Sequence, residues 1–229
     1  QAERIGGIDT YPGRGNYPTS LWVPGEVVVE DYTVPIAANA QAPTAGIIRV
    51  GVYESSTSVH LVPTDAQGRE LAYSPKIGRV RVASRTHIIY APVVETQVNL
   101  GDKVLLTGYD LPTESIAPGG QLPVVLYWKP LTGIMKDYTV FVHLLDENGN
   151  KVAQVDEQPV AGDYPTSLWV TDEVVRDTHY LTLPANLAQG DYTLRIGLYW
   201  LETGERLPLM NANPPTDYEE IGPVHVGNE

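Results

Sequence analysis

The chain has 229 residues, which suits one large β domain or two smaller ones. Hydrophobic residues make up 42% of it and charged residues 19%, which excludes disorder for most of the chain. The formal net charge of −13 disfavours nucleic acid as a partner, and zero cysteines exclude disulfides, thiolate zinc sites and cysteine nucleophiles.

Short stretches in which Val, Ile, Thr and Tyr alternate with polar residues recur along the chain, separated by Gly, Pro or Asn-Gly. This pattern predicts an all-β protein of tandem antiparallel β-sandwiches. The clearest strands are expected at residues 122–128, 138–145, 151–156, 192–200 and 221–226. No run is long and apolar enough for a membrane helix, so we expect no membrane insertion of this segment.

A seven-residue segment, Tyr-Pro-Thr-Ser-Leu-Trp-Val, occurs twice, at residues 17–23 and 164–170, and Glu-Val-Val follows each copy. Two further pairs of similar segments follow in the same order, 49–53 with 195–199 and 77–82 with 221–226. Such a repeat indicates two copies of one β unit. We therefore predict an incomplete β-sandwich repeat over residues 1–82, a linker over 83–97 and a complete β-sandwich repeat over 98–229.

The first copy is the shorter one. Sixteen residues precede its motif, whereas residues 98–163 precede the motif of the second copy, so about three strands are missing from the first. A sandwich without them exposes its core and an unpaired edge, which natural proteins avoid. Because the chain begins with Gln1 and not Met, we interpret its start as a cleavage point or a mature terminus. The missing strands then lie upstream in a parent protein, or another subunit donates them.

The second copy carries a series of short motifs: GDKVLLTGY at 101–109, PGGQL at 118–122, LYW at 126–128, DYTVFVHL at 137–144 and GDYTLRIGLY at 190–199. This series resembles the tandem extracytoplasmic β-sandwich domains appended to membrane glycosyltransferases of the family 39 type and related surface proteins of filamentous green bacteria. The resemblance implies an immunoglobulin-like or carbohydrate-binding-module-like sandwich outside the membrane. In that family the chemistry belongs to a multi-helix membrane part, so glycosyl transfer is not implied for these residues.

Gly190-Asp191-Tyr192, at the start of a predicted strand, resembles a tyrosine corner, in which the phenol bonds nearby backbone. We assign Tyr192 a structural role. The first copy has Gly46 at the aligned position, so its crossover must be held differently.

The sequence contains few signs of catalytic chemistry. There is no Gly-x-Ser-x-Gly elbow, phosphate loop, His-Glu-x-x-His or dinucleotide fingerprint. The histidines are dispersed, at positions 60, 87, 143, 179 and 225, so we expect no metal, no cofactor and no enzymatic activity. An unrecognised carboxylate pair of the glycosidase type stays open as an alternative. The acidic pairs Asp172-Glu173 and Glu219-Glu220 are interpreted as solvated turns.

The repeated aromatic residues have two interpretations. Tyr17 with Trp22, and Tyr164 with Trp169, could stack on sugar rings or contact a partner. The structural interpretation, in which the tryptophan plugs one end of a sandwich core, is favoured because large aromatic side chains are mostly buried. Trp128 is expected on a core strand, whereas Trp200, at a strand end, is the better candidate for an exposed contact.

Three functional hypotheses follow. The first is a non-catalytic extracytoplasmic module for contact with a protein partner or with copies of itself, completed by strand complementation or acting as the soluble tail of a membrane glycosyltransferase-like protein. The second is a glycan-binding module, and the third is a glycoside hydrolase with an unrecognised carboxylate pair. The absence of catalytic motifs and the incomplete first copy favour the first hypothesis.

Overall fold

The computed structural model describes residues 3–86 and 88–227; Gln1 and His87, which the sequence analysis names, lie outside the described residues. The chain is nearly all β, with 40% strand and 6% helix, which confirms the predicted fold class. It divides into two compact units, Gln1–Ala42 and Pro43–Glu229. The boundaries expected from the sequence, 1–82, 83–97 and 98–229, stay predictions.

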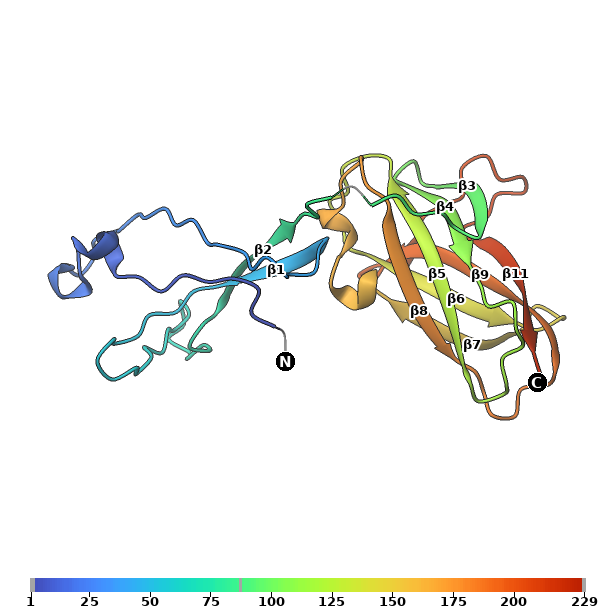
Figure 1. Cartoon of the computed structure of the whole chain (residues 1–229), viewed down its shortest axis with the longest axis horizontal. Helices are drawn as coiled ribbons and strands as arrows, with labels where there is room; N and C mark the ends of the chain where they lie inside the picture. The colour runs from blue at the N-terminus through green and yellow to red at the C-terminus, as the bar shows by residue number, and fades with distance from the viewer. Residues whose placement is uncertain (1–2, 87, 228–229) are drawn as a thin grey trace. The chain divides into compact units, whose positions relative to one another are not determined.

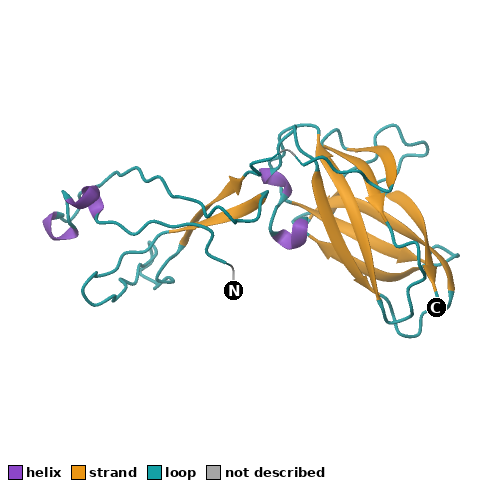
Figure 2. Cartoon of the chain, viewed as in Figure 1, coloured by secondary structure: helices purple, strands orange, loops and turns teal. Residues whose placement is uncertain are grey.

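Figure 2 shows that the strands concentrate in the larger unit, whereas residues before β1 form loops and short helical turns. The 3₁₀ turns are η1 (Pro12–Gly15), η2 (Thr19–Leu21), η3 (Val160–Gly162) and η4 (Thr166–Leu168). The strands are β1 (Thr44–Arg49), β2 (Lys76–Val82), β3 (Val94–Leu100), β4 (Val104–Asp110), β5 (Gln121–Pro130), β6 (Tyr138–Leu145), β7 (Lys151–Glu157), β8 (Val175–Thr182), β9 (Gly190–Trp200), β10 (Glu205–Arg206) and β11 (Glu219–Val226). No helical turn in the described ranges is long or apolar enough to cross a membrane.

Residues from β3 onward fold into a sandwich of two antiparallel sheets. One sheet has the order β3-β4-β5-β8, and the other has the order β10-β9-β6-β7 with β11 also paired to β9. In Figure 1, β5 and β8 run side by side in one layer, and β6, β7 and β9 lie in the other. The strands predicted over 122–128, 138–145, 151–156, 192–200 and 221–226 all fall within this sandwich.

The core lies between the two sheets. Side chains alternate along a strand, so every second residue of β6 and β9 points inward and is buried. Each such aliphatic side chain contributes about 1.5 to 3 kcal/mol when it is fully buried. The fully buried large side chains include Trp128, Tyr164, Leu106, Leu126, Leu144, Leu194 and Ile196.

Strands β1 and β2 form an antiparallel hairpin that repeats the pairing of β9 with β11. The residue pairs of the hairpin are Thr44 with Val82, Ala45 with Arg81 and Gly46 with Val80, and the aligned pairs in the sandwich are Gly190 with Val226, Asp191 with His225 and Tyr192 with Val224. The first copy therefore builds the same strand pair in the same register. On the other side of β9 lies β6, and β1 belongs to a two-stranded sheet without such a neighbour.

The smaller unit holds the first motif and has little regular structure. A single antiparallel bridge, Gly6 with Ile36, is described in it, together with the bond from the Ala37 N–H to the Ile5 carbonyl oxygen at 2.7 Å. Residues 28–35 align with β8 but form no strand. In the sandwich β8 pairs with β5, and the first copy has no segment that aligns with β5.

Residues 4–10 of the first copy align with β7, since Arg-Ile-Gly-Gly-Ile-Asp-Thr matches Lys-Val-Ala-Gln-Val-Asp-Glu. The first copy thus has sequence for β7, β8, β9 and β11. The strands without a counterpart are β3, β4, β5 and β6, which is one more than the three expected from length alone.

Candidate functional site

The second copy of the motif folds into a short turn that fills one end of the sandwich. Pro165 holds the extended backbone (φ −66°, ψ 153°) that precedes η4, and the Trp169 indole N–H donates to the Tyr164 carbonyl oxygen at 2.9 Å. Thr166 links the turn to the start of β6, because its hydroxyl accepts from the Tyr138 N–H at 2.8 Å. Tyr164 and Trp169 are 0% and 4% exposed, so both rings are part of the core.

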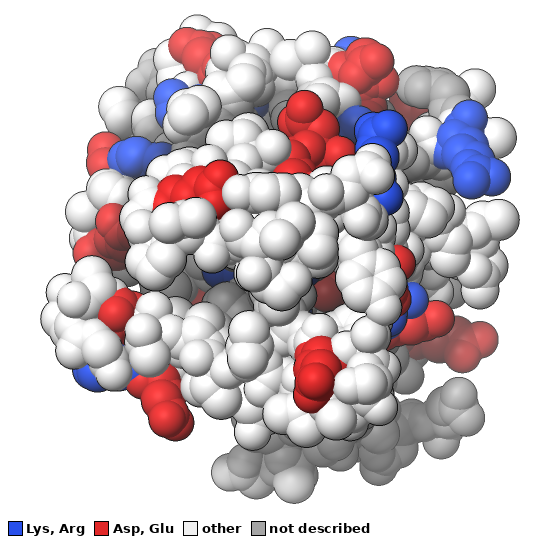
Figure 3. Space-filling model, turned by 90° about the vertical axis from the view of Figure 1, so that its left-hand side faces the viewer, with Lys and Arg blue, Asp and Glu red and all other residues white. Residues whose placement is uncertain are grey.

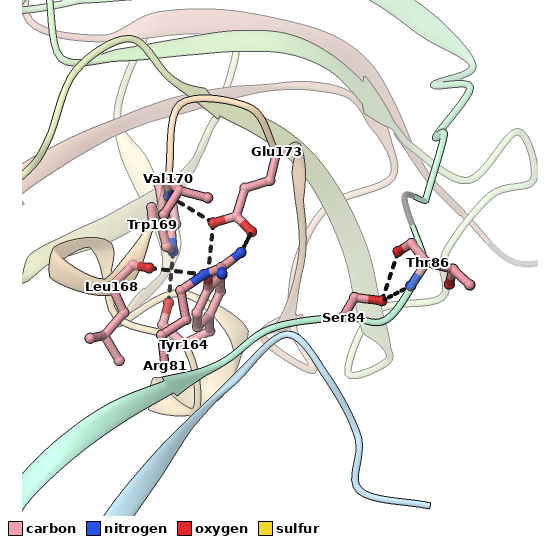
Figure 4. Close-up of polar contacts among 8 residues, drawn as sticks. All are labelled: Arg81, Ser84, Thr86, Tyr164, Leu168, Trp169, Val170 and Glu173. Atoms are coloured by element: carbon pink, nitrogen blue, oxygen red, sulfur yellow. Dashed lines mark hydrogen bonds and ion pairs between the residues drawn. The ribbon is translucent and has the colours of Figure 1, made fainter. Parts of the chain in front are cut away.

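Arg81 from β2 reaches this turn and forms a cluster with Tyr164 and Glu173, which we call the arginine clasp (Figure 4). The Arg81 Nε donates to the Tyr164 hydroxyl oxygen at 2.6 Å, and its terminal nitrogen donates to Glu173 Oε2 at 2.7 Å. The Tyr164 hydroxyl in turn donates to Glu173 Oε1 at 2.7 Å. The Val170 N–H donates to the same oxygen at 2.9 Å. The Glu173 carboxylate therefore accepts bonds from Arg81, Tyr164 and the backbone.

Burial and charge together set the protonation of the clasp. The Arg81 and Glu173 side chains are 27% and 15% exposed, so the ion pair is partly shielded from water. Burial raises the pKa of the Tyr164 phenol, and its hydrogen bond to Glu173 raises it further. Burial disfavours the Arg81 guanidinium, but the bonds to Glu173 and Tyr164 outweigh that effect and raise its pKa. The phenol is therefore neutral and the guanidinium charged at neutral pH.

The hairpin makes further contacts with the same end of the sandwich. Arg79 pairs with Asp137 at 2.7 Å, and the Ala45 N–H donates to the Asp163 carbonyl oxygen at 2.7 Å. Burial opposes ionisation of Asp137, but bonds from Ser167 and then Arg79 lower its pKa. Ala45 is the strand partner of Arg81, so one residue pair of the hairpin supplies both the side-chain and the backbone contact.

A depression of about 300 Å³ lies beside the clasp and is lined by Pro43, Arg81, Ser84, Arg85, Tyr90 and Asp172, among others. Figure 4 shows Ser84 turned toward Thr86, where its hydroxyl donates to the Thr86 carbonyl oxygen at 2.8 Å. This contact is local to the loop.

The first copy of the motif makes most of the same internal contacts. The Tyr17 hydroxyl lies 2.6 and 2.8 Å from the two carboxylate oxygens of Glu26, and the Val23 N–H donates to Glu26 at 3.1 Å. The Trp22 indole N–H donates to the Tyr17 carbonyl oxygen at 3.2 Å. The hydrogen bond between the Tyr17 hydroxyl and the Glu26 carboxylate raises the pKa of Tyr17 and lowers that of Glu26.

Two differences separate the copies. Trp22 is 39% exposed where Trp169 is 4% exposed. In addition, no basic side chain among residues 3–86 and 88–227 bonds Tyr17 or Glu26, so the first motif has the two acceptors of a clasp but not its arginine.

The turn ahead of the motif is also repeated. In η3 the backbone of Val160 and Ala161 has φ 56° and 52°, and in η1 the aligned Gly13 and Arg14 have φ 63° and 53°. The Val160 N–H donates to Asp177 at 2.8 Å, and the Gly13 N–H donates to the aligned acid, Glu30. Asp177 also accepts bonds from the side chains of Trp128 at 3.2 Å and His179 at 2.7 Å.

The remaining candidates lie apart from the clasp. Trp200 is half-buried, and the Lys136 ammonium lies 3.6 Å from the centroid of its ring, so this face is occupied. Tyr192 is buried, and its hydroxyl donates to the Ala188 carbonyl oxygen at 2.8 Å, which is the geometry of a tyrosine corner.

Two expectations about acidic pairs need correction. Glu219-Glu220 was expected to be a solvated turn, but both residues belong to β11, and burial raises the pKa of Glu219. Asp172-Glu173 was also expected to be a solvated turn; Asp172 is exposed in a turn, but the Glu173 carboxylate is a partly buried hydrogen-bond centre. Sequence reasoning missed the clasp, although one signal was present: both copies place glutamate nine residues after the tyrosine, as Tyr17 with Glu26 and Tyr164 with Glu173. In the described ranges, no cluster of three or more His, Asp or Glu side chains could hold a metal ion.

No family model matches the chain, and no curated protein matches its sequence. Among solved structures, the chain is similar to a crystal structure of the C-terminal domain of Wzt, at 13% identity and a TM-score of 0.39. The match covers 61% of this chain and 83% of that one. The β-sandwich itself is established by the strand pairing of the chain.

Proposed function

We propose that this chain is a non-catalytic β-sandwich module for protein contact or self-assembly, in which strands from a partner complete the first copy. The observation that carries the proposal is a difference in burial at aligned positions. Apolar side chains of the first copy are 39% to 63% exposed, whereas their counterparts in the second copy are at most 4% exposed. The aligned pairs are Trp22 with Trp169, Val34 with Leu181, Ile48 with Leu194, Val50 with Ile196, Val52 with Leu198, Ile77 with Ile221 and Val80 with Val224.

A single added strand, equivalent to β6 of the sandwich, would cover both the exposed apolar face and the open strand edge of the first copy. In the sandwich, Ile196 and Leu198 of β9 pair with Val142 and Val140 of β6, which also covers one side of the core. Among residues 3–86 and 88–227, no strand takes the place of β6 beside the aligned Val50 and Val52. An added strand would satisfy backbone groups along this edge while it buries the apolar face, the two terms that stabilise strand addition.

The character of the surface supports protein contact. In the view of Figure 3, charged side chains stand in small groups among uncharged residues. Exposed apolar residues of the first copy include Val27, Val29 and Ile77. Large exposed apolar areas on a protein mark interaction surfaces. We further propose an extracytoplasmic location, either as a separate protein or as the soluble tail of a membrane glycosyltransferase-like protein, because the motifs of the second copy resemble domains placed there.

The proposal gives the chain no catalytic role, and the chemistry of its buried acids supports this. Asp177 and Glu173 each accept several hydrogen bonds from side chains and backbone that hold the fold together. A glycosidase instead needs two carboxyl groups that face a shared space for the sugar.

The test is the size of the full chain in solution across a range of concentrations, by light scattering or sedimentation. We expect concentration-dependent association, and slow amide exchange along residues 47–54 in the associated state. Val50→Lys and Val52→Lys, which charge the open face of the first copy, should abolish it. Val59→Lys changes an exposed valine of the hairpin loop and is the matched control. A monomer whose first copy is fully protected from exchange contradicts the proposal.

Glycan binding is the second candidate, favoured by the exposure of Trp22 beside the Tyr17 and Glu26 side chains. Retardation in gels that contain soluble polysaccharide would detect it. Binding predicts that Trp22→Ala migrates freely while Tyr180→Ala, which removes an exposed aromatic ring of β8, is still retarded. Equal migration of the wild type with and without polysaccharide speaks against glycan binding.

A further inference from the structure

We infer that Tyr17 and Glu26 form a receptor for an arginine side chain that a strand of a partner molecule carries. This inference rests on the proposed function and adds the chemistry of the partner segment. The second copy shows the occupied form of such a receptor, because Arg81 of β2 bonds both Tyr164 and Glu173 there.

The acceptors of the first copy are already arranged. The phenol and the carboxylate are in contact, and the Val23 N–H holds the carboxylate as the Val170 N–H does in the second copy. One detail differs. Tyr17 contacts both oxygens of Glu26, whereas Tyr164 contacts one oxygen of Glu173 and leaves the other to Arg81. An incoming arginine therefore takes one carboxylate oxygen from the phenol, which keeps its bond to the other.

The chemistry selects arginine over lysine. In the clasp, Nε and a terminal nitrogen of one guanidinium reach two different acceptors, a phenol oxygen and a carboxylate oxygen, at 2.6 and 2.7 Å. A planar fork of fixed geometry can do this, whereas a lysine ammonium is a single point of charge. The acidic balance of the chain, −13 in all, also attracts a basic segment.

The backbone contact points to a paired strand as the carrier. In the second copy the Asp163 carbonyl oxygen accepts from the N–H of Ala45, the strand partner of Arg81. The residue aligned with Asp163 is Asn16, directly before Tyr17. The first copy therefore offers the same carbonyl beside the same pair of acceptors.

The carrier is a partner strand that resembles β2 and not the last strand of this chain. At the position aligned with Arg81, β11 has His225, which bonds Asp191 at 2.6 Å. Arg81 itself is engaged with the second copy. The first receptor thus fits an arginine from a partner strand that lies outside residues 1–229 and whose sequence follows the pattern of β2.

The experiment uses the full chain and a synthetic peptide of residues 76–85, Lys-Ile-Gly-Arg-Val-Arg-Val-Ala-Ser-Arg, followed by fluorescence anisotropy at low salt. We expect saturable binding, weakened about tenfold or more by Tyr17→Phe or Glu26→Gln in the chain, or by Arg81→Lys in the peptide. Glu70→Gln removes the same charge from an exposed glutamate elsewhere and should leave binding unchanged.

Three outcomes overturn the inference: no saturable binding at millimolar peptide, equal weakening by Glu26→Gln and Glu70→Gln, or loss of binding with Glu173→Gln alone, which would place the peptide at the second copy. The inference and the proposed function fail separately. A chain that never self-associates but binds the peptide through Glu26 contradicts self-assembly only. A chain that self-associates through Val50 and Val52 while Glu26→Gln has no effect on the peptide contradicts the receptor only.

Discussion

The two copies of Tyr-Pro-Thr-Ser-Leu-Trp-Val share most of their internal hydrogen bonds but lie in different surroundings. In both, the indole bonds the carbonyl of the tyrosine, and a glutamate joins the phenol to the backbone after the tryptophan. Within the part of the chain that the structure describes, only the second copy is buried at the end of a sandwich and bonded by an arginine. The local turn is therefore specified by nearby residues, whereas its burial depends on strands that lie far away in the sequence.

The largest expected effect comes from removing the tryptophan of each copy. Trp169→Ala should destabilise the larger unit by about 3 to 5 kcal/mol, because it empties a filled core site. Trp22→Ala should cost less than about 1 kcal/mol, since part of this ring already contacts water. Urea unfolding of both variants measures the difference, and equal losses would show that the two rings are packed alike.

Breaking the clasp should have an intermediate effect. Arg81→Ala and Glu173→Gln should each cost about 1 to 3 kcal/mol, because each leaves a partly buried polar partner without its bond. The double variant should lose less than the sum, with a coupling of about 1 kcal/mol. Strict additivity in denaturant unfolding would mean that the two side chains do not stabilise one another. Glu26→Gln, at the aligned but exposed position of the first copy, should cost less than Glu173→Gln.

Stability at high pH should depend on Tyr164. Its folded pKa is raised above the unfolded value of about 10 by burial and then by Glu173. Its contribution is therefore complete below pH 10 and is lost as the pH rises toward the folded pKa, by at most about 1.4 kcal/mol per pH unit. Tyr164→Phe should flatten this alkaline decline in urea unfolding between pH 9 and 11. An unchanged slope would contradict the assignment.

The smallest expected effect concerns the backbone of the turn before the motif. Ala161 has φ 52°, a left-handed conformation that costs a residue with a Cβ about 1 kcal/mol more than glycine. Ala161→Gly should raise stability by about 0.5 kcal/mol, seen as a higher melting temperature. Ser167→Gly, at a position of the motif without positive φ, should lower it.

Much of the fold was predictable because its signals are local. Period-two alternation marked the core strands, and the repeated segments revealed that β1 with β2 and β9 with β11 are versions of the same strand pair. The register of the hairpin follows from that alignment. The same comparison, made on residues 4–10, would also have identified the counterpart of β7.

The clasp was not predictable in the same way. Arg81 is 83 residues from Tyr164, and the aligned residue of the second copy is His225, so comparing the copies hides its role. Asp177 shows the same limit. Its partners Trp128 and His179 come from β5 and β8, and alternation alone predicts an apolar residue at such an inward position.

The long chain separation within the clasp has a consequence for how the molecule folds. The contact between Arg81 and Tyr164 closes a loop of 83 residues that contains β3 to β7, and forming so distant a contact early carries a large entropic cost. That cost falls once the intervening strands have paired and brought the loop ends together. The clasp should thus form after the sandwich has condensed, as a late step that locks the hairpin onto a finished surface.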